Sequence, residues 1–310
     1  MGRNMRLPAA LVVGTLLAGC GTQAGSPPPA PDPPRAGVPA ATSAPPQRVD
    51  PVALIGSWAL AETDEGAGEV LRLGHAEGYG DLLLFGRCGV LMSTWRADPN
   101  GLFVAGVPAG AVPDDGAKCR SSRQFVPAWL RRVTAFRVEG TSPVLVDEQG
   151  RHLARLLPGA RPTPGPNLLP SLTEPPVVTD ETRRAFGPAA ALPPTLVPVR
   201  SDTMLGRWVS VDDRNAPSPR IRPEAPYLEL GADGAWRGSD GCNGLNGRWL
   251  AGPAGTLLAT SEPSTQIGCD NVSIQTWLAT AWRAGLDGDT LVLLDVQGRE
   301  LGRLRRAGPA

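Results

Sequence analysis

Few residues of this 310-residue chain have the types and spacing that nucleophilic catalysis needs. A catalytic cysteine or serine requires a nearby base, and the two histidines are His75 and His152. Ser239 lies in Gly-Ser-Asp-Gly, which differs from the Gly-x-Ser-x-Gly turn that exposes a nucleophilic serine. The one lysine, Lys118, is not part of a Gly-Lys-Ser/Thr phosphate-binding loop. We therefore expect a protein that is not an enzyme and that binds no cofactor.

The first cysteine, Cys20, indicates a lipid anchor. Residues 1–19 begin with Arg3 and Arg6, continue through an apolar run too short to span a bilayer and end in small residues, which is typical of a secretion signal. Leu17-Ala18-Gly19-Cys20 resembles the bacterial lipobox, in which signal peptidase cuts before a cysteine that receives a diacylglycerol. We expect Cys20 to hold the mature chain on the extracytoplasmic face of the cell membrane. A secreted protein that is cleaved nearby is the alternative.

The composition excludes one class of partner and marks two extended segments. Thirty basic and thirty acidic residues give no overall field to attract nucleic acid. Residues 20–50 are rich in proline and have no aromatic residue, so we expect a disordered tether behind the lipidated cysteine. A second proline-rich segment, residues 161–200, is predicted to be a linker, with one or two helical turns at 179–187.

The blocks before and after this linker, residues 51–160 and 201–307, are predicted to be tandem domains that are copies of one another. The segment VLVDEQGRHLARL (144–156) closely matches VLLDVQGRELGRL (292–304). Other matching pairs are Trp58 and Trp208, Cys88 and Cys242, Trp95 and Trp249, Cys119 and Cys269, and Trp129 and Trp277.

Two disulfides are expected, one within each copy. The chain is predicted to be exported, and each copy holds two cysteines at matching positions, which favours Cys88 with Cys119 and Cys242 with Cys269 among the three possible pairings. In the chain-entropy model such loops contribute about 3 to 4 kcal/mol each. The alternative is four thiolates on a metal ion, which needs closely spaced cysteine pairs that the sequence lacks. No bound metal is expected.

Each copy is predicted to be mainly β structure with one helix. In the second copy a hairpin is expected at 227–238 and another within 292–304. Helical spacing occurs within 271–282, where Ser273 is a candidate cap, and Pro127 is a candidate helix start in the first copy. The predicted fold class is α+β, mainly antiparallel β, with two tandem small β-rich domains. Each is expected to be a sheet or a partly closed barrel with one packed helix.

The second copy resembles the META domain, also called HslJ-like, of bacterial envelope proteins. The residues that carry the resemblance are Leu205-Gly206-Arg207-Trp208, Gly241-Cys242-Asn243 with Gly247 and Trp249, Thr265-Gln266-Ile267-Gly268-Cys269, Trp277-Leu278 and the closing segment 292–304. The first copy has Arg87-Cys88-Gly89 in place of the Gly-Cys-Asn element, so it looks like a diverged META-like domain. The resemblance implies β-rich modules of secreted or membrane-attached proteins that are associated with stress or drug tolerance and have no established catalytic residues.

Aromatic and amide side chains suggest where a ligand would bind. Six of the eight tryptophans recur in pairs, as shared core residues would. Trp236 and Trp282 have no counterpart in the first copy, and Asn243 and Asn246 belong to a glycine-rich stretch found only in the second. These four residues are the candidate ligand contacts, at a barrel mouth or cleft.

Together these patterns predict a membrane-anchored envelope lipoprotein without catalytic activity. Its expected role is stress tolerance or envelope maintenance through interaction with another envelope protein. The alternative is a protein that binds a small molecule or a cell-wall fragment. The expected contact with the membrane is the lipid anchor, and no nucleic acid partner is expected.

Overall fold

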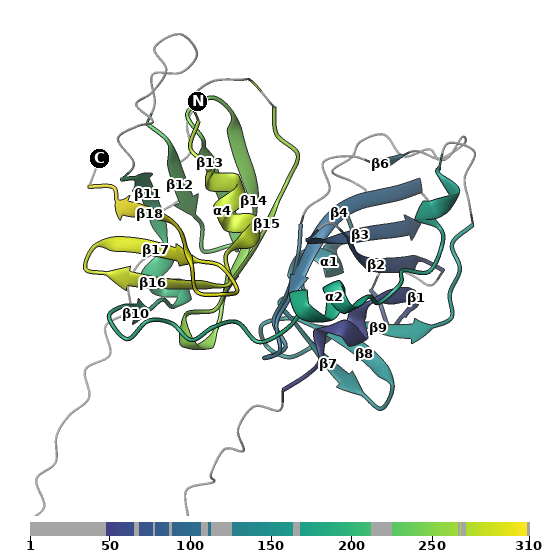
Figure 1. The fold of residues 1–310 in the computed structure, drawn as a ribbon. Helices are drawn as coiled ribbons and strands as arrows, with labels where there is room; N and C mark the ends of the chain where they lie inside the picture. Colours follow the sequence, from purple (N-terminus) through teal and green to yellow (C-terminus); the bar gives the residue numbers. More distant parts are fainter. Residues whose placement is uncertain are drawn as a thin grey trace, which may run out of the picture. The chain divides into compact units, whose positions relative to one another are not determined.

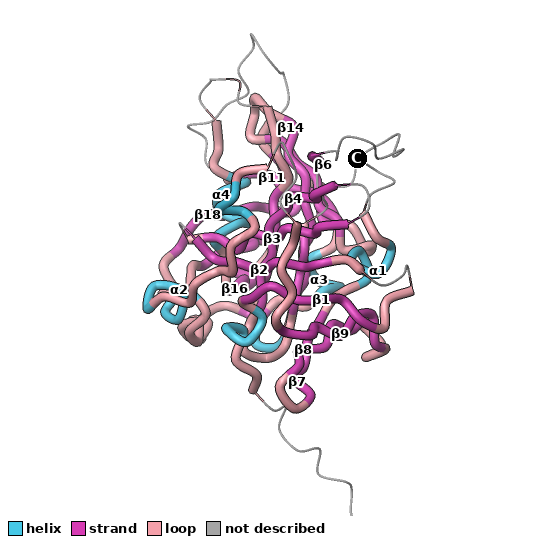
Figure 2. The backbone as a smooth tube through the Cα atoms, turned by 90° about the vertical axis from the view of Figure 1, so that its right-hand side faces the viewer, coloured by secondary structure: helices cyan, strands magenta, loops and turns pink. Residues whose placement is uncertain are grey.

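The computed structural model describes residues 48–64, 68–76, 78–86, 89–106, 111–112, 126–163, 168–211, 225–265, 267 and 271–308. All of them belong to one compact unit, Pro45–Ala310. Strands predominate in this unit, and its helices are short (Figure 1, Figure 2). Across these ranges no helix combines the length and the apolar character needed to cross a membrane.

The first sheet is antiparallel and has nine strands in the order β5-β4-β3-β2-β1-β9-β8-β7, with β6 paired to β4. Its strands are β1 (Gly56–Ala61), β2 (Val70–Ala76), β3 (Tyr79–Gly86), β4 (Gly89–Ala97), β5 (Phe103–Ala105), β6 (Ala111–Val112), β7 (Ala135–Glu139), β8 (Ser142–Val146) and β9 (His152–Pro158). A 3-10 helix, η1 (Pro51–Leu54), precedes β1, and helix α1 (Ala128–Arg132) packs against β9.

The second sheet is also antiparallel, with nine strands in the order β10-β16-β17-β18-β11-β12-β13-β14-β15. Its strands are β10 (Val197–Pro198), β11 (Gly206–Ser210), β12 (Tyr227–Leu230), β13 (Ala235–Ser239), β14 (Gly244–Ala251), β15 (Leu257–Ser261), β16 (Arg283–Asp287), β17 (Thr290–Leu294) and β18 (Glu300–Arg306). Helix α3 (Ser201–Met204) precedes β11, and α4 (Ile274–Thr280) packs against β15 and β18.

Apart from β6 and β10, the two sheets have the same strand order. Strands β1 to β5 correspond to β11 to β15, and β7 to β9 correspond to β16 to β18. In each sheet an isolated antiparallel bridge links the two ends of this order, Leu102 with Ala135 in the first and Thr256 with Arg283 in the second. Each sheet therefore curls into a partly closed barrel. The predicted fold class, α+β with two mainly antiparallel β-rich domains, is confirmed.

Equivalent tryptophans are fixed in the same way in the two barrels. The indole nitrogen of Trp58 donates a hydrogen bond to the carbonyl oxygen of Leu54 at 2.8 Å, and that of Trp208 donates to Met204 at the same distance. A buried indole N–H needs an acceptor. The short helices η1 and α3 supply this acceptor just before the first strand of each barrel.

Both predicted helices are present, but one predicted cap is wrong. The helix expected within 271–282 is α4, and the helix expected near Pro127 is α1. Ser273 occupies the N-cap position of α4, yet its side chain makes no capping hydrogen bond. Its φ of −73° and ψ of 39° differ from the extended backbone that brings a cap oxygen to the helix nitrogens.

Residues of the proline-rich segment 161–200 pack on the barrels. Leu168 and Leu172 contact the outer face of β3 and β4. Helix α2 (Asp180–Ala185) falls within the stretch where helical turns were predicted, and Phe186 stacks on Trp95 with ring centroids 5.3 Å apart. Strand β10 then joins the edge of the second sheet by pairing with β16. The segment thus contributes side chains to the first barrel and a strand to the second.

Two arginines connect the barrels reciprocally. Nη1 of Arg96, on β4, donates to the carbonyl oxygen of Leu278 in α4 at 3.2 Å. Nη1 of Arg248, on β14, donates to the carbonyl oxygen of Arg131 in α1 at 2.7 Å. Carbonyl groups in the last turn of a helix have no partner within the helix. Each arginine therefore donates a hydrogen bond to an otherwise unpaired carbonyl group at the end of a helix in the other barrel.

Candidate functional site

The loop between β13 and β14 contains the Gly-Cys-Asn element, and the Asp240 carboxylate organises it. Oδ1 accepts hydrogen bonds from the backbone nitrogens of Cys242 at 2.7 Å and Asn243 at 2.5 Å. Oδ2 accepts from the side-chain nitrogens of Asn243 at 3.0 Å and Asn271 at 3.2 Å. Gly241 has a φ of 100°, a left-handed conformation that glycine adopts without steric cost. The loop is an internally hydrogen-bonded turn.

Asn243, a predicted ligand contact, is an internal part of this turn. Its side-chain oxygen accepts hydrogen bonds from Oγ1 of Thr265 and the backbone nitrogen of Ile267, both at 2.8 Å. Its side-chain nitrogen donates to Asp240 and to the carbonyl oxygen of Ile267. Both ends of the amide are occupied, and the residue is 3% exposed. Asn243 therefore joins two segments of the protein and has no free group for a ligand, which corrects its predicted role.

The predicted cysteine sites are described in part. Cys242 is buried and forms a disulfide. Its predicted partner Cys269 lies outside the described residues, as do Cys88, Cys119 and the predicted lipidation site Cys20. The pairing of the four cysteines stays a prediction.

Asn246 is the accessible member of the predicted amide pair. It is exposed on β14, and its side-chain nitrogen donates a hydrogen bond to the Glu262 carboxylate. Burial raises the pKa of Glu262, and the hydrogen bond from Asn246 opposes this rise. A half-buried carboxyl beside an exposed amide is a polar feature of the protein surface.

Trp236 is a core residue and not the rim residue that the sequence analysis expected. It is 2% exposed, and its indole nitrogen donates to the carbonyl oxygen of Thr260 at 2.8 Å. It pairs across the strands with Gly247, where a Cβ atom would overlap the Trp236 ring. At the equivalent pair the first barrel has Leu82 opposite Ser93. The larger ring in the second barrel is thus accommodated opposite a glycine, where the first barrel pairs leucine with serine.

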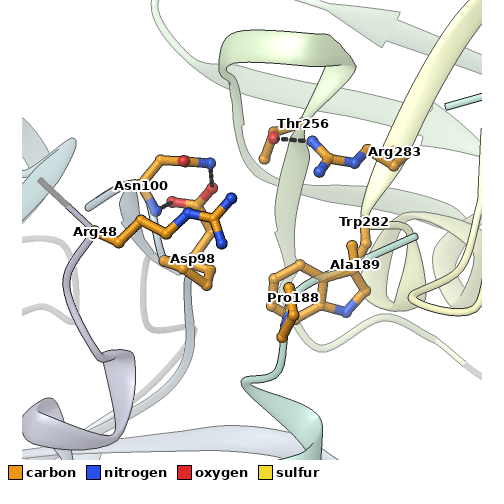
Figure 3. Close-up of a pocket in the computed structure, with 9 residues that line it drawn as sticks. Arg48, Asp98, Asn100, Pro188, Ala189, Thr256, Trp282 and Arg283 are labelled. Carbon is orange, nitrogen blue, oxygen red and sulfur yellow. Dashed lines mark hydrogen bonds between the residues drawn. The ribbon is translucent and has the colours of Figure 1, made fainter. Parts of the chain in front are cut away.

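Trp282, the fourth predicted ligand contact, lines a pocket of about 90 Å³. The other residues that line it are Arg48, Asp98, Pro99, Asn100, Pro188, Ala189, Thr256 and Arg283 (Figure 3). They come from the start of the first barrel, its β4–β5 turn, the segment after α2 and the closing edge of the second barrel. Pockets for drug-sized ligands are several times larger. This pocket has room for one small chemical group.

The Arg283 guanidinium hydrogen-bonds to neutral oxygens. Nη1 donates to Oγ1 of Thr256 at 2.5 Å and, more weakly, to two backbone carbonyls of η5 (Pro253–Gly255). Nε donates to the carbonyl oxygen of Ala190 at 3.3 Å. Burial lowers the pKa of Arg283, and the nearby charge of Asp98 opposes this effect. The cation is held in place by dipoles, without a direct ion pair in the described part of the chain.

The Asp98 carboxylate accepts hydrogen bonds from residues of its own turn. Oδ1 accepts from the backbone nitrogens of Asn100 at 3.1 Å and Leu102 at 2.9 Å, and Oδ2 accepts from the Asn100 side chain at 2.7 Å. Burial raises the pKa of Asp98 above its ordinary value, and these hydrogen bonds offset part of the rise. The carboxylate stabilises the turn between β4 and β5 and lies buried beside the pocket.

A third arginine lies against Trp282. The Arg96 guanidinium is 4.9 Å from the centroid of the Trp282 ring, in the geometry of a cation–π contact. Burial lowers the pKa of Arg96 to about 9, so the group stays charged at neutral pH. Within the described ranges its Nη2 atom is buried without a hydrogen-bond partner. The indole of Trp282 therefore stands in a strongly positive environment.

Sequence reasoning found Trp282 but missed Asp98, Arg283 and Arg96. The polar pocket residues lie far apart in the chain, so no local motif contains them. One signal was available. Like Trp282, Asp98 and Arg283 are not repeated in the other copy. The position equivalent to Asp98 holds Gly252, and the position equivalent to Arg283 holds Ala135. A search for unmatched polar residues in the two copies would have selected them.

The histidines and acidic groups offer no catalytic arrangement in the described ranges. His75 packs edge-on against Phe186, with ring centroids 5.2 Å apart. His152 lies among surface charges, within 3.4 Å of Glu62 and 3.3 Å of Glu139. In the same ranges no three histidine, cysteine, aspartate or glutamate side chains gather as metal ligands would.

Comparison with known families identifies the second barrel. Residues 203–308 match the family model of the META domain, so the chain carries a META domain over this range. The resemblance noted in the sequence is confirmed there. No curated protein and no solved structure matches the chain.

Proposed function

We propose that this chain is a bacterial envelope lipoprotein whose folded unit acts without catalysis. The observation that carries the proposal is the META domain at residues 203–308, a domain type that the sequence analysis associates with envelope proteins. The lipobox-like sequence that ends at Cys20 supports attachment to the cell membrane, on its extracytoplasmic face. The first barrel, which has the same strand order, is proposed to be a diverged META-like domain.

The proposed role is stress tolerance or envelope maintenance through contact with another envelope protein. The distribution of polar groups supports a role without catalysis. In the second barrel, the polar groups of Asp240 and Asn243 are engaged in hydrogen bonds to other residues of the fold. Neither histidine has a serine or cysteine among its described contacts.

Membrane fractionation of cells that express the full chain tests the anchor. Wild-type protein is expected in the membrane fraction, and Cys20→Ala is expected to leave it because the lipid acceptor is missing. Thr22→Ala, which lies just outside the lipobox-like sequence, is the matched control and is expected to stay membrane-bound. A Cys20→Ala variant that still fractionates with membranes contradicts the proposed anchor.

Complementation tests the role. In a strain that lacks this gene, wild-type protein and Thr22→Ala are expected to restore growth under detergent or osmotic stress, and Cys20→Ala is expected to restore less. Equal growth of all strains, with and without the protein, contradicts a role in stress tolerance.

A second candidate function, small-molecule binding, is favoured by one observation. Trp282, the predicted ligand contact, lines a pocket whose polar groups come from distant parts of the chain. Binding at this pocket is compatible with the anchored location, because the lipid and the pocket are independent features. A thermal-shift screen of cell-wall fragments, lipids and antibiotics tests this candidate, and a saturable shift that Trp282→Leu abolishes is the supporting result.

A further inference from the structure

The pocket at Trp282 carries more positive charge than its own carboxylate balances. Arg48 and Arg283 both line it, and Asp98 is the one acidic residue in its lining. Figure 3 shows the Arg48 side chain extended into the space that faces Arg283 and Trp282. The formal charge of the lining is therefore positive.

Neither arginine is neutralised by a hydrogen-bonded carboxylate in the described residues. Arg283 donates to a hydroxyl and to backbone carbonyls. Arg48 is exposed, and its guanidinium has no hydrogen bond or ion pair with any described residue. Asp98 has both oxygens engaged by the nitrogens of its own turn. Guanidinium groups that remain without an anion are suited to receive one, through short charge-assisted hydrogen bonds.

The backbone around the pocket holds these groups in place. The amide of Val49 donates to the carbonyl oxygen of Pro99 at 3.0 Å, which fixes the chain next to Arg48 against the Asp98 turn. Arg283 and Thr256 face each other in the bridge that closes the second barrel. Both arginines therefore start from fixed backbone positions, which lowers the entropic cost of ordering them around a ligand.

The remaining lining is mixed, and the space is small. Trp282, Pro99, Pro188 and Ala189 are apolar, whereas Asn100 and Thr256 are polar. The Trp282 ring and Pro188 form one side of the pocket in Figure 3. The cavity volume is about 90 Å³, well below that of pockets for drug-sized ligands. A planar carboxylate with a short apolar stem matches this space. A phosphate group has no apolar part to pack against the Trp282 ring, so the apolar side of the pocket favours a carboxylate with a short stem.

From these contacts we propose that the pocket binds the carboxylate of a small organic anion. Arg48 and Arg283 hold the carboxylate oxygens, and Trp282 packs against the apolar part of the ligand. This inference rests on the small-molecule binding function proposed above and names its ligand class. It is independent of the lipid anchor.

Calorimetric titration of the folded protein tests the charge requirement. The probes are propionate and propionamide, which have nearly the same shape and differ in charge, with inorganic phosphate as a second anion. Propionate is expected to bind saturably, and propionamide and phosphate are expected to give no saturable signal. Arg48→Gln is expected to weaken propionate binding at least about tenfold, because a charged partner of the carboxylate is lost. This variant is expected to fold normally, since Arg48 is exposed.

Two further variants sharpen the result. Trp282→Leu is expected to weaken propionate binding through the loss of the apolar contact. Arg305→Gln, an exposed arginine on β18, is the matched control and is expected to bind propionate as the wild type does.

The outcomes separate the two proposals. Propionamide that binds as well as propionate, or propionate binding unchanged in Arg48→Gln, overturns the carboxylate inference while leaving small-molecule binding intact. Phosphate binding without propionate binding also overturns it. If no probe in this set and no compound of the screen binds at Trp282, both the inference and the binding function fail.

Discussion

The two barrels share their architecture and differ at the residues that surround the pocket. Both have the same strand order, and both fix an equivalent tryptophan to the carbonyl four residues earlier. The turns at Asp147 and Asp295 are also alike, because each carboxylate accepts hydrogen bonds from the same two backbone nitrogens and from one arginine. Repeated residues therefore build the barrel, and unmatched residues account for the differences between the two barrels.

The unmatched features fall into three groups. The second barrel organises its β13–β14 turn around Asp240, where the first barrel has Gly86. The first barrel receives Phe186 from the proline-rich segment, which stacks on Trp95. The third group is the pocket, where Asp98 of the first barrel lies near Trp282 and Arg283 of the second. Two of these features stabilise a single barrel, and the third lines the pocket that we propose as a ligand site.

The largest effect is expected from the turn that only the second barrel has. Asp240→Ala removes the acceptor of four hydrogen bonds and leaves buried donors without partners. We expect the free energy of unfolding to fall by about 3 kcal/mol or more. Chemical denaturation measures this change. Asp233→Ala, in an exposed turn, is the control and should cost less than about 1 kcal/mol. Equal losses in the two variants would mean that the Asp240 turn does not set this barrel apart.

A comparable effect, confined to the first barrel, is expected from Phe186→Ala. The ring is buried against Trp95 and His75, so its removal leaves a cavity and should cost about 3 kcal/mol. Hydrogen exchange checks where the loss occurs. Faster exchange is expected in β2, β4 and β5, with β12 to β14 unchanged. Leu169→Ala, at an exposed position of the same segment, is the control. Uniform loosening of both barrels would contradict a role limited to the first.

Equal effects are expected where the barrels are alike. Trp58→Phe and Trp208→Phe each remove one buried indole hydrogen bond of the same length. Each should lower the free energy of unfolding by about 1 to 3 kcal/mol, and the two losses should agree within about 1 kcal/mol. Thermal and chemical unfolding of both variants measure this. A much larger loss in one variant would break the proposed equivalence of the two positions.

The smallest effect is a pH dependence in the first barrel. Burial lowers the pKa of His75 below its ordinary value of 6.5, against the opposing charges of Glu181 and Asp81. The unfolded chain therefore binds the proton more readily than the folded one. The contribution of His75 to stability is fully present above pH 6.5 and is lost as the pH falls toward the folded pKa.

Stability measured between pH 7 and pH 5 tests this sign. The wild type should lose slightly more stability on acidification than His75→Gln, by less than about 1 kcal/mol because His75 is only partly buried. A variant His75→Gln with the same slope as the wild type would contradict the lowered pKa.

The shared architecture was predictable from the sequence because the same pattern occurs twice, and a weak strand or helix signal in one copy is supported by the other. Two copies of the same tryptophans and hairpins predicted β-rich domains and one helix in each. The prediction for Trp236 is wrong because the lack of a counterpart in the first copy does not imply an exposed position. In the structure Gly247 gives up the volume that the Trp236 ring fills, which a comparison of single positions does not reveal.

The site was harder to predict because its residues come from distant parts of the sequence and lie together only in the folded protein. The sequence predicted Trp282, but Asp98 and Arg283 lie 185 residues apart in the chain, so no local motif contains both. The packing of the proline-rich segment was missed for a related reason. Proline content predicts extended backbone, but it does not exclude that Leu172 and Phe186 pack against a barrel.

The central claim is that one barrel is built twice in this chain, each time with its own disulfide. Peptide mapping by mass spectrometry, without reduction and on the exported protein, tests it most directly. The account predicts links between Cys88 and Cys119 and between Cys242 and Cys269, with no free thiol among these four. A link that joins the two barrels, such as Cys88 with Cys242, would contradict it.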